Sequence, residues 1–466
     1  MTVGRSSAGT PTAPPPSGIG DVLVPVALAA LFFLTRLAML WLVRQEGAGF
    51  VPNDISYYGY YLDKLEQGDA GVMREYPPPA VWILAWIYRI GGGWQTWTPY
   101  FASFMFLLDA ITTVALYRRA RPWAALFWIL FTFFNGAIMW YRFDLLTSVL
   151  VAWACLGARR IPKAAGAFIG LGAAIKLWPA LLIGPLLAPR PWSRTPTAGR
   201  SRLLGFAVVG FGLALASLLV HGWERTASAL SWQSDRGLHI ESVPATPLMF
   251  LRTYTGLESW NIAMSDYNAL ELSGPLVPTM LAVSTALTAG AVLLAVWCSW
   301  RLVRRYRDDD PECHAAATIA ILAVIAAMMV ANKVYSPQYT LWLGGPAAVL
   351  LVIDTPRWLR RHVAVAAVTT LAVAATTQLS YPWAAQGIMA LPMGSGLETS
   401  VLILRNALLV ALLAHTAYLA GRATRGPRAE QPPLAASGPR RAGESNGVVE
   451  QARFRGTRLS SGHNRA

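Results

Sequence analysis

Twelve apolar stretches follow one another along this chain, and no other feature of the sequence constrains the fold more. A helix needs about 20 apolar residues to cross a bilayer, and several stretches are shorter, so tilted or broken helices are expected. We predict an all-α polytopic membrane protein with about 12 transmembrane helices. The stretches cover roughly residues 22–43, 97–117, 122–140, 144–158, 163–176, 178–189, 203–221, 276–300, 315–331, 338–353, 363–380 and 401–420.

One pair of these stretches is interrupted by polar and helix-breaking residues. Lys176 and Pro179 lie in the middle of 163–189. A proline inside an apolar run removes a backbone donor and ends or kinks a helix. The sequence therefore predicts two short helices with a turn between them.

The composition agrees with a membrane location. Hydrophobic residues make up 55% of the 466 positions and charged residues only 14%, a ratio typical of polytopic membrane proteins. The segments 1–20 and 421–466 are instead rich in Pro, Gly, Ser or Arg, which favours disorder. We predict a transmembrane domain at 21–420 between two disordered cytoplasmic termini.

The formal charge of +15 is explained by topology. Arginines and lysines gather in alternate loops, and cytoplasmic loops carry such an excess. This indicates that the protein lies in the plasma membrane with both termini cytoplasmic, and it disfavours nucleic acid as a partner, leaving membrane lipids. The basic loops lie at 118–121, 159–163, 190–202, 301–307 and 357–361.

This orientation predicts a large first extracytoplasmic loop, 45–96, and a second at 222–275. The apolar segment 77–93 falls inside the first loop. Counting it as a span would place the arginines at 118–121 outside, against the charge rule. We therefore interpret 77–93 as a re-entrant or interfacial element.

Asp54 is the strongest catalytic candidate in the first loop. It lies about ten residues past the first span, among Asn and Tyr residues. A carboxylate at the membrane surface can serve as a general base when an acceptor hydroxyl reaches it. The alternative is an Asx-turn or a helix cap before Ser56.

Further charged residues fall at the outer ends of spans. Arg142 and Asp144 flank Phe143, and either pair with each other, as a helix-entry ion pair, or orient a substrate. Lys176 lies between two apolar helices, where an unpaired charge is costly. It either binds a phosphate or carboxylate, or extends to the interface.

The second loop contains a cation, an imidazole and a carboxylate within six residues, Arg236, His239 and Glu241. Together they can bind a phosphate and sugar hydroxyls, although an ordinary polar loop has the same composition. Lys333, between two later spans, is a further phosphate candidate.

Other polar residues within spans favour structural roles. Arg36 and Asp109 lie in the first two spans and are expected to pair inside the bundle. The three cysteines have no spacing for a disulfide framework or a metal site. Phosphate-loop, His-Glu-x-x-His and Gly-x-Ser-x-Gly motifs are missing from the sequence, and we predict no cofactor.

An ordered set of motifs resembles a known family. The set comprises Asp54, Tyr76-Pro77-Pro78, Arg142-Phe143-Asp144-Leu145-Leu146, Ala174-Ile175-Lys176-Leu177-Trp178-Pro179, Arg236-Gly237-Leu238-His239-Ile240-Glu241-Ser242 and Asn332-Lys333-Val334-Tyr335-Ser336-Pro337-Gln338-Tyr339. Across about residues 20–420, the chain resembles the actinobacterial glycosyltransferase family 87. These are polyprenol-phosphate-mannose-dependent α-mannosyltransferases of the membrane-embedded C-type (GT-C) superfamily.

The resemblance implies an inverting transfer of mannose from a polyprenyl phosphate-mannose donor to a lipid or glycolipid acceptor on the extracytoplasmic face. Because two cations can stabilise the departing phosphate, we expect that no metal is required. The resemblance also raises Asp54 to the catalytic position. Lys333 and Arg236 are the first choices for binding the donor phosphate. The remaining expected contacts are Lys176 and Arg142 for the phosphate, and His239, Glu241, Asp144, Tyr57, Tyr76 and Gln338 for the substrates.

Three alternatives remain open at this point. The same fold can transfer another sugar, such as arabinose or glucose, from a polyprenyl phosphate. A lipid-linked sugar flippase or transporter would move the substrate without forming a glycosidic bond. A membrane scaffold would tolerate the loss of both Asp54 and Lys333. The acceptor and the linkage do not follow from the sequence.

Overall fold

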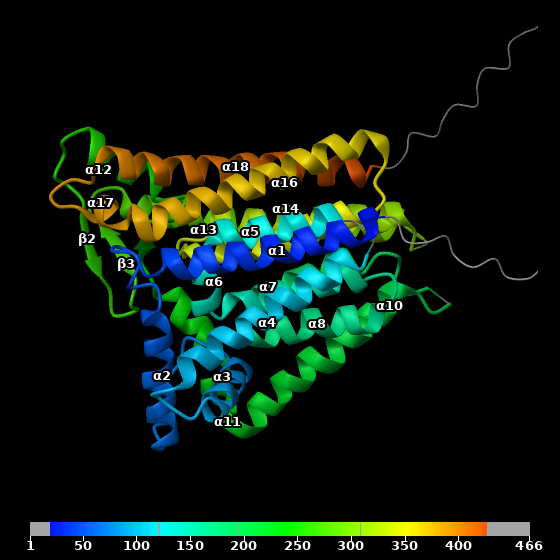
Figure 1. Ribbon diagram of the computed structural model, residues 1–466, viewed down its shortest axis with the longest axis horizontal. Coiled ribbons are helices and arrows are strands. Elements are labelled where there is room, and N and C mark those ends of the chain that lie inside the picture. Colours follow the sequence, from blue (N-terminus) through cyan, green and yellow to red (C-terminus); the bar gives the residue numbers. More distant parts are fainter. Residues whose placement is uncertain (1–18, 120–121, 194, 308, 426–466) are drawn as a thin grey trace, which may run out of the picture. The chain divides into compact units, whose positions relative to one another are not determined.

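A computed structural model describes residues 19–119, 122–193, 195–307 and 309–425, apart from the side chains of residues 19–21 and 54 (Figure 1). The expected disorder of 1–20 and 421–466 falls almost wholly outside the described residues. The first half contains α1 Ile19–Leu42, α2 Asn53–Glu66, α3 Pro78–Ile90, α4 Trp97–Tyr117, α5 Pro122–Asn135, α6 Ile138–Tyr141, α7 Asp144–Gly157, α8 Pro162–Ile175, η1 Trp178–Leu182, α9 Ile183–Leu186, α10 Ala198–Phe206, η2 Ala207–Phe211 and α11 Gly212–Ser234. The second half contains β1 Leu238–His239, α12 Thr246–Tyr254, β2 Asn261–Met264, β3 Leu270–Ser273, α13 Val277–Arg305, α14 Pro311–Ala331, η3 Pro337–Thr340, α15 Leu341–Val352, α16 Arg357–Gln378, η4 Leu379–Trp383, α17 Ala385–Met389 and α18 Gly396–Ala423.

Long apolar helices dominate the described chain. Seven of its helices are long and apolar enough to cross a membrane, and α5, α7 and α8 are shorter apolar helices of 14 residues each. This confirms a mainly helical membrane protein, while the number of twelve spans stays a prediction. The seven are Val22–Leu42, Trp97–Tyr117, Ala198–Ser234, Val277–Arg305, Pro311–Ala331, Arg357–Trp383 and Gly396–Ala423.

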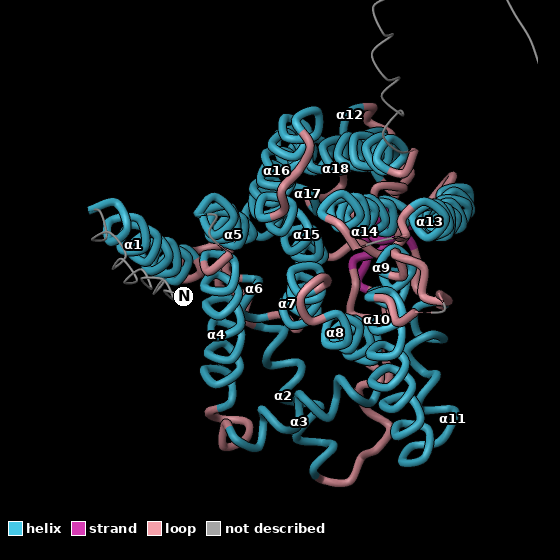
Figure 2. The backbone as a smooth tube through the Cα atoms, turned by 90° about the vertical axis from the view of Figure 1, so that its right-hand side faces the viewer, coloured by secondary structure: helices cyan, strands magenta, loops and turns pink. Residues whose placement is uncertain are grey.

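The bundle has a buried centre and an apolar outer surface. Figure 2 shows α14 and α15 in its interior, with α13, α16, α18 and α7 around them and α1 at one edge. Helix α14 is apolar on every side, and 89% of its span is buried, as expected for a helix at the centre of a bundle. The large side chains of α1, in contrast, are mostly exposed, as on a surface that faces lipid.

Several spans are broken at the positions where the sequence carries helix breakers. Helix α8 ends at Ile175, and η1 begins at Trp178, with Lys176 in extended backbone between them. The predicted pair of short helices in 163–189 is therefore confirmed. Helix α5 likewise ends at Asn135, before Gly136 with φ 72°.

The predicted second loop, 222–275, contains regular secondary structure along much of its length. After a break at Gly222 (φ 74°), α11 continues to Ser234, well past the expected end of the span at 221. The three strands that follow form a small antiparallel sheet, in which β3 lies between β1 and β2. Leu238 and Leu272 from this sheet are buried against α12 and α13, so the fold is not purely helical.

The first loop also folds, and it is fastened to the second. It forms α2 and α3, and α3 at 13 residues is too short to span, in agreement with the interpretation of 77–93. Trp82 of α3 donates a hydrogen bond to His221 (3.1 Å). Arg225 of α11 donates to the carbonyls of Met73 and Tyr76, at 3.0 Å each. The two segments therefore build one wall together.

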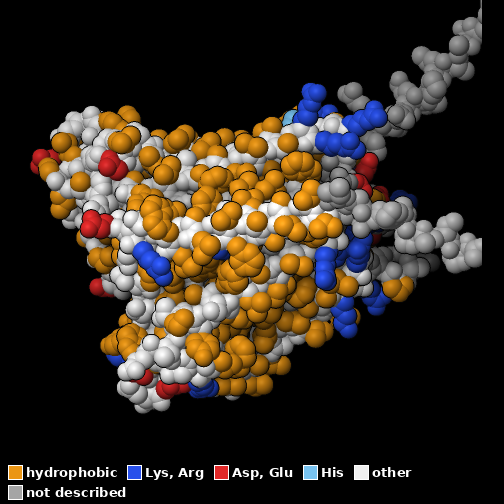
Figure 3. Space-filling view, viewed as in Figure 1, with side chains coloured by type: hydrophobic (Ala, Val, Ile, Leu, Met, Phe, Trp, Pro, Cys, Tyr) orange, Lys and Arg blue, Asp and Glu red, His pale blue; other side chains and the backbone are white. Residues whose placement is uncertain are grey.

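Charges separate toward the two ends of the bundle. In Figure 3, most Lys and Arg side chains on the visible face gather at one end, and Asp and Glu side chains mark the other, with an apolar band between. Helices α2 and α12 and the sheet lie at the acidic end (Figure 1). The arrangement agrees with the predicted basic cytoplasmic loops, and the orientation itself stays a prediction.

The expected pairing of Arg36 with Asp109 is present inside the bundle. The Arg36 Nη2 and Asp109 Oδ2 atoms are 2.6 Å apart, and the two side chains are 3% and 0% exposed. Trp128 of α5 donates to the other Asp109 oxygen (2.9 Å). This network fastens α1 to α4 and α5 at a depth where each charge needs its partner.

Candidate active site

A cavity of about 730 Å³ is lined in part by residues of α2 and of the β2–β3 turn, elements that lie at the acidic end of the bundle (Figure 1). Its volume is in the range of small-molecule sites. Nine of the residues singled out from the sequence line it. They are Tyr57, Tyr76, Arg142, Asp144, Lys176, Arg236, His239, Glu241 and Gln338.

The walls of the cavity differ in chemistry. The β2–β3 turn contributes Tyr267 and Asn268. Helix α13 contributes Thr288, Ala291 and Val292. The wall there is mostly apolar and includes Leu181, Ala291 and Met328. The site is thus a polar chamber with an apolar arm.

Asp144 and Lys176 form an ion pair on one wall of the chamber. Their Oδ1 and Nζ atoms are 2.7 Å apart, and Trp342 donates to the same oxygen (2.9 Å). The Lys176 ammonium also lies 4.7 Å from the centre of the Tyr339 ring. This contact and the ion pair hold the cation at a fixed place in the cavity.

The aromatic wall behind Lys176 is a stack of three rings. Trp178 stacks on Trp342 with centroids 4.5 Å apart, and Trp342 stacks on Tyr339 at 4.3 Å. The indole nitrogen of Trp178 is buried and has no hydrogen-bond partner among the described residues. Such a group needs a partner from a ligand or water.

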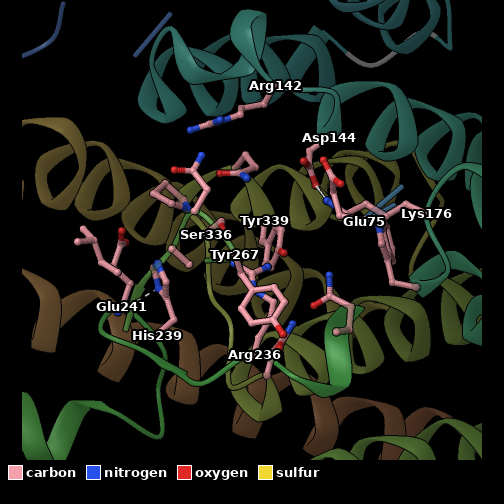
Figure 4. A pocket seen from close by; sticks show the side chains of 18 of the residues that line it. Glu75, Arg142, Asp144, Lys176, Arg236, His239, Glu241, Tyr267, Ser336 and Tyr339 are labelled. Atoms are coloured by element: carbon pink, nitrogen blue, oxygen red, sulfur yellow. Dashed lines mark hydrogen bonds and ion pairs between the residues drawn. The ribbon is translucent and has the colours of Figure 1, made fainter. Parts of the chain in front are cut away.

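Arg142 takes a different place from the one expected for a simple pair with Asp144. Its hydrogen-bond partner is Tyr381, and it lies within electrostatic reach of Asp144 and Tyr339. Figure 4 shows Arg142 on one side of the cavity, with Glu241 and His239 across from Asp144, Glu75 and Lys176. The charged groups therefore surround the chamber.

Glu241 has a partner that was missed from the sequence. Arg405 of α18 lies 3.3 Å from the Glu241 carboxylate and donates to the Glu241 carbonyl at 2.6 Å. Arg405 is fully buried, and its guanidinium lies 4.0 Å from the centre of the Tyr335 ring. The sequence predicted α18 as a span, but nothing local linked it to a loop 164 residues earlier.

His239 is held as a neutral imidazole. Its Nδ1 accepts a hydrogen bond from the Glu241 backbone N–H (3.3 Å), and the His239 backbone N–H donates to the Lys333 carbonyl (3.0 Å). Burial lowers the pKa of His239 to about 3, and the charges of Arg236 and Arg405 act in the same direction. At neutral pH this side chain acts as a hydrogen-bonding group and not as a cation.

The depressed pKa of His239 predicts a loss of stability in acid. The folded state releases a proton that the unfolded chain keeps below pH 6.5, so the free energy of unfolding falls as pH drops from about 6.5 toward 3. Between pH 7 and 5 this amounts to about 2 kcal/mol. His239→Asn keeps an acceptor for the Glu241 N–H. Between pH 7 and 5, its free energy of unfolding is expected to fall by about 2 kcal/mol less than that of wild type, as measured by denaturant titrations at the two pH values.

The same comparison isolates His239 from its neighbours. Burial raises the pKa of Glu241, and Arg405 opposes this shift. A raised carboxyl pKa increases the free energy of unfolding as pH falls, but this contribution is the same in wild type and in His239→Asn. An equal drop in stability for wild type and His239→Asn would contradict the assignment.

Glu75 is a cavity carboxylate that sequence reasoning missed. It accepts a hydrogen bond from the Tyr57 hydroxyl (2.7 Å), and Tyr76 donates to the Tyr58 hydroxyl (3.1 Å). Burial raises the pKa of all three tyrosines, so they remain neutral. The position of Glu75, directly before Tyr76-Pro77-Pro78, was the available signal.

Two predicted residues lie apart from this set. The Lys333 ammonium donates to the Ser234 carbonyl (2.8 Å) at the end of α11, and Lys333 does not line the cavity. This position does not support the prediction of Lys333 as a first choice for binding the donor phosphate. Asp54 is the second residue of α2, and its side chain lies outside the described part of the structure.

Arg236 is better placed to meet an anion. It lines the cavity just past the end of α11, and its buried Nε has no partner among the described residues. The Gln338 Oε1 atom is also buried and has no hydrogen-bond partner among the described residues. Within the residues that the structure describes, no three His, Cys, Asp or Glu side chains gather in a way that could hold a metal ion.

The chain matches the model of a known protein family. The model of glycosyltransferase family 87 matches residues 75–331, more than half of the chain. The matched region contains Glu75, Arg142, Lys176 and Arg236, and it begins after Asp54. No curated protein is significantly similar to the chain.

Proposed function

The chain belongs to glycosyltransferase family 87 and is a membrane glycosyltransferase, and we propose that it transfers mannose from a polyprenyl phosphate-mannose donor to a lipid or glycolipid acceptor on the extracytoplasmic side. One observation supports this reading most strongly. A single cavity joins a chamber lined by three cations to an apolar arm along α13. A lipid phosphosugar has the same division into an anionic head and a hydrocarbon tail.

The cations explain how the donor would be held and activated. Arg236 binds a phosphate through charge-assisted hydrogen bonds, while Lys176 and Arg142 supply positive charge across the chamber. Charge develops on the departing phosphate as the bond to the anomeric carbon breaks. Cations fixed in advance stabilise that charge more in the transition state than in the ground state.

Asp54 completes the reaction as the general base. It removes the proton of the acceptor hydroxyl, whose oxygen forms a bond to the anomeric carbon while the bond from that carbon to the phosphate oxygen breaks. The products are the glycoside with inverted configuration and a polyprenyl phosphate. Tyr57 and Tyr58 of the same helix, α2, line the cavity, which supports this role.

Arg236→Met is expected to weaken use of the donor. Losing one charge-assisted hydrogen bond to phosphate costs about 1.5–3 kcal/mol, so kcat/KM for the donor should fall about tenfold or more. Initial rates at varied donor concentration measure this. Lys333→Met is the matched control and should change the same constant less than about threefold, since its ammonium faces Ser234. Equal effects of the two changes would restore Lys333 as a phosphate ligand.

The proposed function is tested with purified protein in nanodiscs, a short-chain polyprenyl phosphomannose and extracted membrane lipids as acceptors. Mass spectrometry should find new glycosides carrying one added hexose. Transfer only from a polyprenyl phosphoarabinose or phosphoglucose would replace mannose by that sugar. Passage of donor across the bilayer without any glycoside would favour a flippase.

A further inference from the structure

The outer end of the cavity carries an aromatic pair that neither the ion pairs nor the phosphate-binding cations use. Trp232, near the end of α11, and Tyr267, in the turn between β2 and β3, line the cavity. Their ring centroids are 5.1 Å apart, and the rings are perpendicular at 88°. Both side chains are only partly buried, so part of each ring is open to a ligand.

The backbone holds this pair in place from two sides. The β2–β3 turn closes through a hydrogen bond from the Ser265 N–H to the Ala269 carbonyl (2.9 Å), with Asn268 at φ 50°. Strand β3 is paired with β1 and β2. Tyr267 is thus presented by a hairpin braced by a third strand, while Trp232 is presented by a helix.

Planar polar groups surround the two rings. Gln233 and Asn268 line the cavity and are exposed, and the buried Nε of Arg236 has no hydrogen-bond partner in the described part of the chain. Figure 4 shows the Tyr267 ring beside Arg236. An aromatic face packs against the C–H groups of a pyranose ring, because these carry partial positive charge and the face is negative. Amide and guanidinium groups bind the hydroxyls at its edge.

The pair lies on the acceptor's side of the proposed reaction. The apolar wall, where the donor tail fits, includes Ala291, Val292 and Met328, whereas Gln233 and Asn268 beside the aromatic pair are polar and exposed. Figure 4 shows Arg236, the proposed phosphate ligand, beside the Tyr267 ring. A sugar on the pair therefore lies next to the proposed site of the donor phosphate.

We propose that Trp232 and Tyr267, with Gln233 and Asn268, form the acceptor subsite, and that the acceptor is a sugar-bearing molecule whose pyranose ring stacks on this pair. The inference rests on the proposed transfer of sugar and adds the class of acceptor. It excludes a simple lipid alcohol or a protein hydroxyl as the preferred acceptor.

The test compares octyl α-mannopyranoside with octanol as acceptors for the protein in nanodiscs. Wild type should use the glycoside with a kcat/KM at least about a hundredfold higher. Trp232→Ala and Tyr267→Ala should each raise KM for the glycoside about tenfold, as expected for the loss of one stacking contact, and should change the donor KM less. Tyr267→Phe, which keeps the ring, should stay within about threefold of wild type.

Trp223→Ala is the matched control, since Trp223 lies on the same helix, is 74% exposed and does not line the cavity. Unchanged glycoside KM in both folded alanine variants, equal use of octanol, or a larger rise in donor KM than in glycoside KM would each overturn the inference. Size-exclusion elution verifies folding.

Saturation-transfer NMR with the glycoside separates this inference from the reaction itself. Contact of the sugar protons with wild type but not with Trp232→Ala supports the subsite even if no donor is turned over. Failure of transfer together with such contact would therefore count against the donor or the base and not against the subsite. Equal contact in both proteins would overturn the subsite.

Discussion

Asp54→Asn is expected to lower kcat by about 10²–10⁴-fold, the usual contribution of a positioned general base. The amide has the same shape but does not accept the acceptor's proton at neutral pH. Because position 54 lies in the first turn of α2, the fold should remain intact. Single-turnover rates with preloaded donor measure the chemical step directly, and circular dichroism verifies the helix content.

Two further carboxylates in the first loop make this prediction specific. Asp69→Asn is the control, since the Asp69 side chain is exposed and only accepts a hydrogen bond from the Gly71 N–H (3.0 Å); its rate should match wild type. Glu75→Gln tests the other cavity carboxylate. If Glu75→Gln abolished the chemical step while Asp54→Asn retained it, Glu75 would take over the role of the base.

Asp109→Ala is expected to lower the free energy of unfolding by about 3–5 kcal/mol, the cost of leaving a buried charge without its partner. Arg36 would keep its charge at 3% exposure and lose two hydrogen bonds to the carboxylate. Denaturant titration of the purified protein in detergent, followed by tryptophan fluorescence, measures the change. Since Arg36 belongs to α1, detachment of that helix should be the first event of unfolding.

The double variant Arg36→Met with Asp109→Leu separates charge from packing. It removes both charges and keeps most of the volume, and replacements of this kind are often neutral or stabilising. Recovery of most of the lost stability is therefore expected. A single variant Asp109→Ala as stable as wild type would show that the ion pair contributes nothing to the attachment of α1.

Local signals in the sequence predicted much of the fold. Apolar runs correctly indicated the positions of the long helices, and Lys176 with Pro179 indicated the break between α8 and η1. The signals did not reveal that α11 resumes after Gly222, because residues 223–234 are polar enough to resemble a loop. They also did not reveal the sheet, whose short strands gain stability from burial of Leu238 and Leu272 and not from a long alternating pattern.

The candidate site shows the same division between local and distant information. Motifs near span ends correctly pointed to residues that meet in one cavity, among them Arg142, Lys176 and Arg236. Partners on distant helices were not predictable, since the Glu241–Arg405 contact depends on how α18 packs. Lys333 illustrates the converse, because its place between two spans suggested access to the chamber while its side chain faces a carbonyl on α11.

The shortness of α5, α7 and α8 has a consequence for where the chemistry occurs. A helix of 14 residues is about 21 Å long, whereas the hydrocarbon layer is about 30 Å thick. Asp144 begins α7 and Lys176 follows α8, so with the far ends of these helices at one membrane surface, the ion pair would lie within the hydrocarbon layer. In the proposed reaction, water would then reach the donor phosphate through the cavity, and the polyprenyl chain would enter the site sideways from the lipid layer.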